Sequence, residues 1–383
     1  MTTVFDKIRD TFTVPTRHVT MSITASNGLK LIAIIAVLFI HTTARWEVSF
    51  MRNHGYFSED FLAIFLNQVA RFSVPFFVFI SGFGLAVKYQ ADSKKGKPFS
   101  LKEFFSRRAL KIGLPFLVLT LVILISQKKL GTNLSLPENI QVLFTYLFKR
   151  GADYHFYFFT IILECYALFP LLFRINSTWL LAGLFLLHVI FTAPSHIFFQ
   201  KMGWYRPSFP ASFIVYWVFY FYLGIYLSYN LVGFTAKLKK IHNYWVIIIF
   251  LLAFGLVMYE YIYWSNVYSS STKAGPGYYN HFHRQTVLFY SLAFIILVFK
   301  YNDILDNLMQ RRAFQFAAPF SFSIYIFHTW MLRLLHQTPL THNAIALTIT
   351  LFVLTLALFY ALNRVILFKP LRVLLGLPEG LVK

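Results

Sequence analysis

Three ionisable side chains lie deep inside long apolar segments of the sequence. They are His41, which follows Lys30 by eleven positions, Glu164 and His328. A charged group at the centre of a bilayer costs about 2.5–3.5 kcal/mol on insertion scales, so each needs a partner, a watery cavity or a function. At about 1.5 Å rise per helical residue, all three lie at a similar depth in three different segments. We therefore predict that His41, Glu164 and His328 form one catalytic site.

The elements that must position these groups are membrane-spanning helices. The 383-residue chain is 58% hydrophobic and only 13% charged, against about 25% charged residues in a soluble protein. Apolar runs of about 20 residues, the length that crosses a bilayer, recur along it. The prediction is an all-α, polytopic transmembrane helical bundle of about ten spans, near residues 28–46, 61–89, 104–126, 155–174, 178–194, 211–230, 243–264, 284–300, 315–335 and 343–368.

The net charge of +21 is explained by membrane topology. Most of the 35 Lys and Arg residues fall in segments that become cytoplasmic if both termini are inside. This excludes nucleic acid as the expected partner and leaves membrane lipid. The expected organisation is a cytoplasmic segment 1–26, a transmembrane domain 27–370 and a cytoplasmic tail 371–383. One cysteine excludes a cysteine-based metal cluster, and no metal is predicted.

Basic residues gather at the predicted cytoplasmic ends of two spans. Arg108 and Lys111 are three positions apart, on one face of an α-helix, with Arg107 beside them and Lys30 at the start of the first span. Arginine grips a phosphate through two hydrogen bonds and lysine adds a point charge. These four residues are the predicted binding site for a phosphate-bearing cosubstrate.

Further polar positions accompany the deep groups. In the second span Pro75 allows a kink, and Ser81, Gly82 and Gly84 permit close approach of another helix or a ligand. The segment 137–149 is apolar enough to lie on the membrane surface as an amphipathic helix. The residues expected to bind substrate are Arg71, Ser81, Tyr157, Ser321 and Tyr325.

Five short motifs resemble the acyltransferase type 3 family of integral membrane proteins. Lys30-x10-His41 has the spacing of that family's Arg-x10-His, and Arg108-Ala-Leu-Lys111 is similar to its Arg-x-x-Arg, with Lys in place of Arg each time. The other three similar stretches are FSVPFFVFISGFGL at 72–85, HFYFFTIILECYALFPLL at 155–172 and SFSIYIFHTWML at 321–332. Together the motifs cover most of the chain.

The resemblance implies transfer of an acyl group, commonly acetyl, from cytoplasmic acyl-CoA to a hydroxyl of an extracytoplasmic sugar or cell-envelope glycan. His41 is then the expected general base, since a neutral imidazole near pH 7 suits that task. A covalent acyl-imidazole is the alternative. Glu164 and His328 are expected to orient a histidine or hold the sugar.

The same resemblance implies a multi-pass protein of the bacterial cytoplasmic membrane, similar to stand-alone members without a fused extracytoplasmic domain. A homodimer or a glycan-synthesis partner is left open. Two other classes also remain open. A polysaccharide or lipid-glycan exporter would use the same polar cavity as a path, and an ion-coupled solute transporter would need carboxylates along one.

Overall fold

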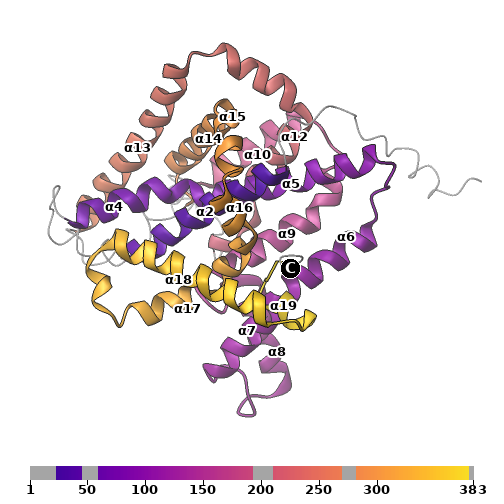
Figure 1. Ribbon diagram of the computed structural model, residues 1–383, viewed down its shortest axis with the longest axis vertical. Helices are drawn as coiled ribbons and strands as arrows, with labels where there is room; N and C mark the ends of the chain where they lie inside the picture. Colours follow the sequence, from indigo (N-terminus) through magenta and orange to yellow (C-terminus); the bar gives the residue numbers. More distant parts are fainter. Residues whose placement is uncertain (1–22, 45–58, 193–209, 270–281, 379–383) are drawn as a thin grey trace, which may run out of the picture. The chain divides into compact units, whose positions relative to one another are not determined.

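The computed structural model describes residues 23–44, 59–192, 210–269 and 282–378, which form helices joined by turns (Figure 1). This confirms the all-α prediction. Of the predicted terminal segments, residues 1–22 and 379–383 lie outside the described ranges. The chain divides into two compact units. The first is built mainly from Val78–His188 and Arg206–Ala236, and the second mainly from Thr24–Phe77 and Lys237–Lys383.

Among the described residues, five helices are long and apolar enough to cross a membrane, or six if a pair bent by 77° at Tyr301 is one span. The protein is therefore a multi-pass membrane protein, but the count of ten spans and the side of each terminus are not confirmed. Two of the expected spans, α9 (Tyr157–Leu172) and α10 (Thr178–Phe191), are shorter apolar helices of 16 and 14 residues. At 1.5 Å per residue these two helices fall short of the roughly 30 Å hydrocarbon core.

The first unit is held together by a close crossing of two helices. An added Cβ on Gly82 would lie 2.2 Å from the Phe221 carbonyl oxygen, and one on Gly224 would lie 2.2 Å from the Phe79 carbonyl oxygen. The two backbones touch there because neither glycine has a side chain, which confirms the predicted close approach at Gly82. The unit consists of the C-terminal part of α5 (Ser73–Lys94), α6 (Leu101–Arg108), the π-helix η2 (Ala109–Gly113), α7 (Leu114–Ser126), α8 (Leu136–Thr145), the π-helix η3 (Tyr146–Arg150), α9 (Tyr157–Leu172), α10 (Thr178–Phe191), η4 (Pro210–Ser212), η5 (Ile214–Tyr216) and α12 (Val218–Lys240).

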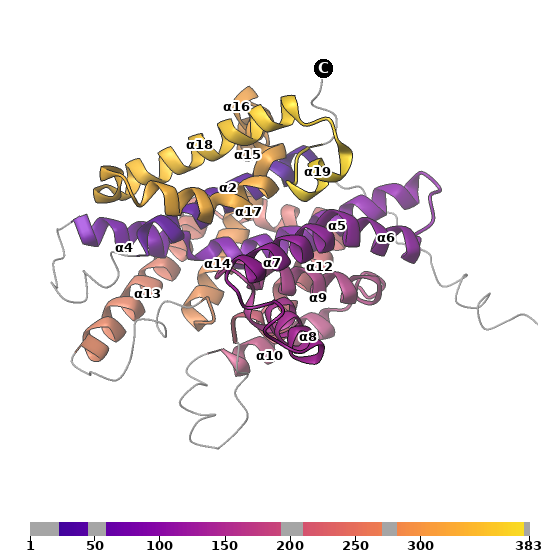
Figure 2. The same cartoon turned by 90° about the horizontal axis from the view of Figure 1, so that it is seen from below.

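The second unit contains the first and the last helices of the described chain. Within it α17 and α18 lie side by side in both views (Figures 1 and 2), and α13 packs against α14. The unit consists of α2 (Ile23–Thr43), α4 (Glu59–Val69), η1 (Ala70–Phe72), the start of α5, α13 (Asn243–Ser269), α14 (Gln285–Lys300), α15 (Asn302–Met309), α16 (Arg312–Ala317), η6 (Ala318–Phe320), α17 (Ser321–Leu335), η7 (Pro339–His342), α18 (Ala344–Val365) and α19 (Lys369–Leu374).

Pro75 interrupts the second predicted span. Proline has no N–H, and its ring crowds the carbonyl four residues earlier, which here belongs to Arg71. The helix responds with a 3-10 turn, η1, at Ala70–Phe72 between α4 and α5. The expected distortion is therefore present, and it places the buried Arg71 in an irregular turn of the helix.

Candidate active site

Two histidines from opposite ends of the sequence meet in the second unit. His41, near the C-terminal end of α2, and His328, in the middle of α17, have ring centroids 5.1 Å apart with their planes tilted by 33°. His328 is fully buried, whereas His41 is partly exposed. The structure thus brings together two of the three residues predicted to form the catalytic site.

The backbone fixes the tautomer of His328. Its Nδ1 lies 2.7 Å from the carbonyl oxygen of Tyr325 and 3.2 Å from that of Ile324. Because a carbonyl oxygen only accepts hydrogen bonds, Nδ1 carries the proton and donates it. In the neutral ring Nε2 is then the nitrogen that can accept a proton. His328 is consequently oriented as a proton acceptor by its own helix.

Hydrogen bonds from α4 and α18 hold the end of α2 that carries His41. The side-chain amide of Asn67 donates to the Ile40 carbonyl at 3.2 Å and to the Thr43 hydroxyl at 2.9 Å. On the other side the hydroxyls of Thr42 and Thr348 are 2.6 Å apart. These contacts on both flanking residues fix the last turn of α2 and so limit the movement of the His41 side chain.

A buried polar network with two arginines continues from this point. Arg71 donates to Asn67 and lies within electrostatic reach of His41, and its guanidinium stacks over the Phe282 ring at 5.3 Å. Arg284 donates to the side-chain oxygen of Gln68 at 2.6 Å. Gln68 in turn donates to Asn67, so one chain of hydrogen bonds connects the two guanidinium groups.

Only one carboxylate belongs to this network among the described residues. Glu260 on α13 lies 3.8 Å from Arg284 and accepts a hydrogen bond from Thr286. The network therefore holds two buried guanidinium groups, of which Arg284 lies beside a carboxylate and Arg71 beside the amide oxygen of Asn67. Arg71 is among the residues predicted from the sequence, whereas Arg284 is not, because its partner Gln68 comes from a distant segment.

Ser321 and Tyr325, predicted to bind substrate, lie on α17 with His328. The Ser321 hydroxyl donates to the Ala318 carbonyl at 2.7 Å. The Tyr325 ring centroid is 6.0 Å from that of His328 and 6.5 Å from that of Phe77. Of the two predicted substrate-binding residues on α17, Tyr325 is therefore the one that lies against the histidine pair.

The predicted phosphate-binding residues Arg107, Arg108 and Lys111 belong to the first unit, and Lys30 belongs to the second. Arg108 is half-buried, with its guanidinium over the rings of Tyr166 at 5.1 Å and Phe104 at 5.6 Å. A π-helix begins directly after Arg108, so Lys111 does not share its face as it would in an α-helix, and Lys111 is exposed. The structure differs from the sequence prediction on this point.

The exposed Arg107 is the third cation of this group. It pairs with Glu103, which also lies 3.5 Å from Lys97. Of the predicted cations, Arg108 thus lies against two aromatic rings, Arg107 is in an ion pair and Lys111 is exposed, and Lys30 belongs to the other unit.

Glu164 also lies in the first unit, half-buried in the middle of α9. Its Oε2 has no hydrogen-bond partner among the described residues. Ser81 is hydrogen-bonded to Tyr166, two residues further along the same helix, and Tyr157 begins that helix. Of the polar groups predicted on α5 and α9, Ser81 therefore contacts Tyr166, one of the two residues whose rings lie against the Arg108 guanidinium. No cluster of three metal-ligating side chains occurs in the described part of the chain.

These observations define the class: a helical membrane protein with a histidine pair suited to proton transfer and an arginine held between aromatic rings. The model of the acyltransferase domain family matches residues 23–364, so the chain belongs to the acyltransferase type 3 family. It is therefore a membrane acyltransferase by family.

Curated relatives are more distant. A probable poly-beta-1,6-N-acetyl-D-glucosamine export protein of Staphylococcus aureus strain Mu50 is 24% identical in an alignment of length 311 that covers 77% of this chain and 79% of the relative. The protein of the same description from strain MSSA476 is 23% identical over the same shares. No solved structure matches the chain.

Proposed function

We propose that the protein is an O-acyltransferase, most simply an O-acetyltransferase of the bacterial cytoplasmic membrane. It would move an acyl group from cytoplasmic acyl-CoA to a hydroxyl of an extracytoplasmic sugar or cell-envelope glycan. The observation that carries the proposal is the contact between His41 and His328, each on a helix whose motif resembles the family pattern. Membership of the acyltransferase family supports the reaction class.

In this proposal His41 is the general base, because the residue is partly exposed while His328 is buried. His41 takes the proton of the acceptor hydroxyl as its oxygen attacks the thioester carbonyl. The tetrahedral oxyanion then collapses, the C–S bond breaks, and the imidazolium returns the proton to the departing thiolate. The products are the acyl ester and CoA with a free thiol, so protons and electrons balance.

The surrounding groups have supporting roles. His328, held by the Tyr325 carbonyl, positions the His41 ring. Arg71 supplies a buried positive charge within electrostatic reach of His41, which would stabilise the oxyanion that forms beside it. Tyr325 and Ser321 would contact the substrate from α17.

The donor would be recognised through its phosphates. Arg108, with its neighbours Arg107 and Lys111, would bind them, and Lys30 is the fourth cation of this set. The stacking of Arg108 on Tyr166 and Phe104 fixes its guanidinium and so lowers the entropy lost when a phosphate binds. Glu164, Ser81 and Tyr157 would hold the sugar or orient a histidine.

The test is direct. Purified protein is incubated with acetyl-CoA labelled in the acetyl group and a panel of envelope glycans, and label in the glycan and free CoA thiol are both measured. Label transfer with equal thiol release supports the proposal. Absence of both with every glycan, for protein that is folded and membrane-inserted, refutes it.

A second candidate, export of a glycan, is favoured by the printed description of the two relatives. An exporter would move a glycan across proteoliposomes without consuming thioester. Transport that proceeds at full rate without acyl-CoA, and with no thiol released when acyl-CoA is present, identifies this function instead.

A further inference from the structure

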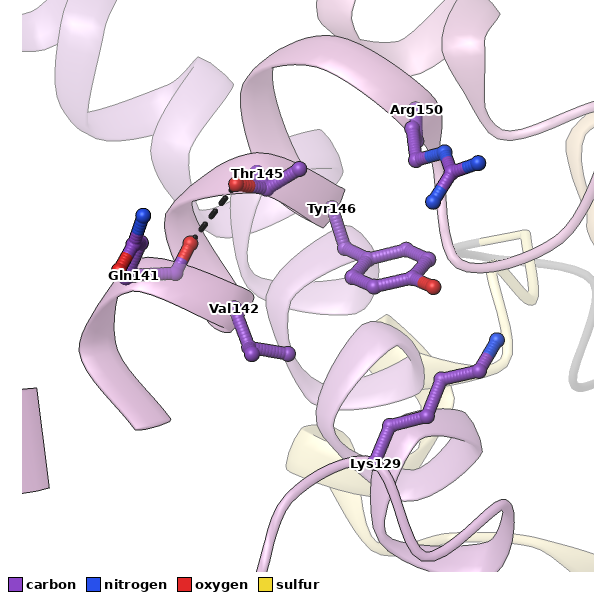
Figure 3. Close-up of a pocket in the computed structure, with 6 residues that line it drawn as sticks. All are labelled: Lys129, Gln141, Val142, Thr145, Tyr146 and Arg150. Carbon is purple, nitrogen blue, oxygen red and sulfur yellow. Dashed lines mark hydrogen bonds between the residues drawn. The ribbon is translucent and has the colours of Figure 1, made fainter. Parts of the chain in front are cut away.

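A pocket of about 370 Å³ in the first unit lies away from the groups used above. It is an open pocket formed by the turn after α7, by α8 and by η3 (Figure 3), and its lining residues are Lys129, Gln141, Val142, Thr145, Tyr146 and Arg150. The lining contains two cations and no acid. The pocket is therefore suited to an anion.

The cationic groups are arranged around Tyr146. The Lys129 ammonium lies over the Tyr146 ring, 4.8 Å from its centroid. Figure 3 shows the nitrogen ends of Lys129 and Arg150 on either side of the hydroxyl end of this ring. A phosphate between them would accept hydrogen bonds from an ammonium, a guanidinium and a phenol, which is a strong, charge-assisted combination.

The turn that carries Lys129 is tied to α8. The Asn139 side chain accepts from the Gly131 N–H at 3.1 Å and donates to the Gly131 carbonyl at 3.0 Å and the Leu134 carbonyl at 3.1 Å. The nearby acid, Glu138, is engaged at the start of α8 by the hydroxyl and N–H of Ser135, and these hydrogen bonds lower its pKa. Glu138 therefore caps α8 and is not one of the groups that line the pocket.

One face of the same helix is apolar and exposed. It consists of four side chains spaced by four residues, with exposures of 73%, 58%, 56% and 50%: Leu136, Ile140, Phe144 and Phe148. The Phe144 and Phe148 rings touch, with centroids 4.5 Å apart. Such a stripe on a short helix in a membrane protein indicates a helix that lies in the membrane interface, as the sequence predicted for 137–149.

We propose that this pocket binds the phosphate headgroup of a membrane lipid, whose acyl chains lie along the stripe of Leu136, Ile140, Phe144 and Phe148. The charge of the pocket matches the phosphate, and the stripe matches the chains. A soluble anionic glycan would use only the first of these two features. The proposal is independent of the acyl-transfer proposal.

The experiment uses full-length protein in neutral detergent, titrated with phosphatidylglycerol and followed by native mass spectrometry. Lys129→Gln and Arg150→Gln should each weaken binding about fivefold, and the double variant about 25-fold, from about 1 kcal/mol for each cation at a lipid surface. Lys129→Arg, which keeps the positive charge, should bind the lipid as the unchanged protein does. The matched control is Lys149→Gln, which removes an exposed charge adjacent to Arg150 but outside the pocket lining and should change binding less than twofold.

Two further ligands distinguish the sources of the phosphate. Diacylglycerol, with the same chains but no phosphate, should bind at least tenfold more weakly. Arg150→Gln should weaken the binding of glycerol phosphate, whereas Phe144→Gln should leave it unchanged. Both substitutions should weaken the binding of phosphatidylglycerol. Equal binding of the double variant and the unchanged protein overturns the site, and equal loss in Lys149→Gln does the same. Saturable binding of glycerol phosphate without binding of phosphatidylglycerol overturns the lipid assignment.

Discussion

Replacing Gly224 by alanine should loosen the first unit. The added Cβ would lie 2.2 Å from the Phe79 carbonyl oxygen and 2.7 Å from the Phe83 nitrogen. Ordinary van der Waals contact begins at 3.4 Å, so the shorter of these two distances is more than 1 Å too small. Overpacking costs about 1–3 kcal/mol. We expect the upper end of that range, because both neighbours are backbone atoms that cannot rotate away and the two helices must separate.

Gly233→Ala is the matched control on the same helix. A Cβ at Gly233 meets no atom within 4 Å. Alanine in a helix interior is favoured over glycine by about 0.5–1 kcal/mol, so this variant should be slightly stabilised. The two alanine variants should therefore differ by about 3 kcal/mol, or several degrees in thermal midpoint.

The assay uses the one cysteine of the chain, Cys165, which is fully buried on α9 in the same unit. A thiol-reactive dye that fluoresces on reaction reports exposure of Cys165 as the protein is heated in detergent. All variants are measured at one heating rate, because unfolding of membrane proteins is often irreversible. The backbone crossing is not the contact that holds this unit if Gly224→Ala has the same thermal midpoint as the unchanged protein. The same conclusion follows if Gly233→Ala loses as much stability as Gly224→Ala does.

Three other substitutions follow from the described contacts. Lys128 has a positive φ of 55° at the end of α7, so Lys128→Gly should stabilise the protein by about 1 kcal/mol, and a lower thermal midpoint would contradict this. Glu260→Gln removes the carboxylate beside Arg284 and should lower the free energy of unfolding by about 1–3 kcal/mol. This is less than for a fully buried ion pair, because the Glu260 side chain is 20% exposed. An unchanged thermal midpoint would show that the ion pair is unimportant. Asn139→Ala releases the turn that carries Lys129 and should weaken phosphatidylglycerol binding less than Lys129→Gln does, whereas unchanged binding would show that the turn needs no such tie.

Much of the fold follows from local patterns in the sequence. Apolar runs predict helices, Pro75 predicts the interruption of its span, and Gly82 predicts a close helix crossing, because each depends on the chemistry of its own segment. Depth along a helix also places His41 and His328 at a similar level, and their rings are in contact in the structure.

Other features depend on which segments meet, and the sequence pattern does not contain that information. The pairing of Arg284 with Gln68 joins residues more than 200 positions apart. The π-helix after Arg108 changes the face on which Lys111 lies, and no residue type in the segment marks it. The count of ten spans is not confirmed for a related reason: α9, with 16 residues, and α10, with 14, are shorter than the apolar segments that predicted them.

The central claim, that the histidine pair performs acyl transfer, is tested most directly by thiol release from acetyl-CoA in the presence of an accepted glycan. His41→Ala should lower the rate at least about 100-fold, within the range typical of general-base removal, while the thermal midpoint stays close to that of the unchanged protein. His242→Ala, at an exposed histidine outside the pair, should leave the rate unchanged. Normal turnover by His41→Ala, or an equal loss in His242→Ala, would contradict the assignment.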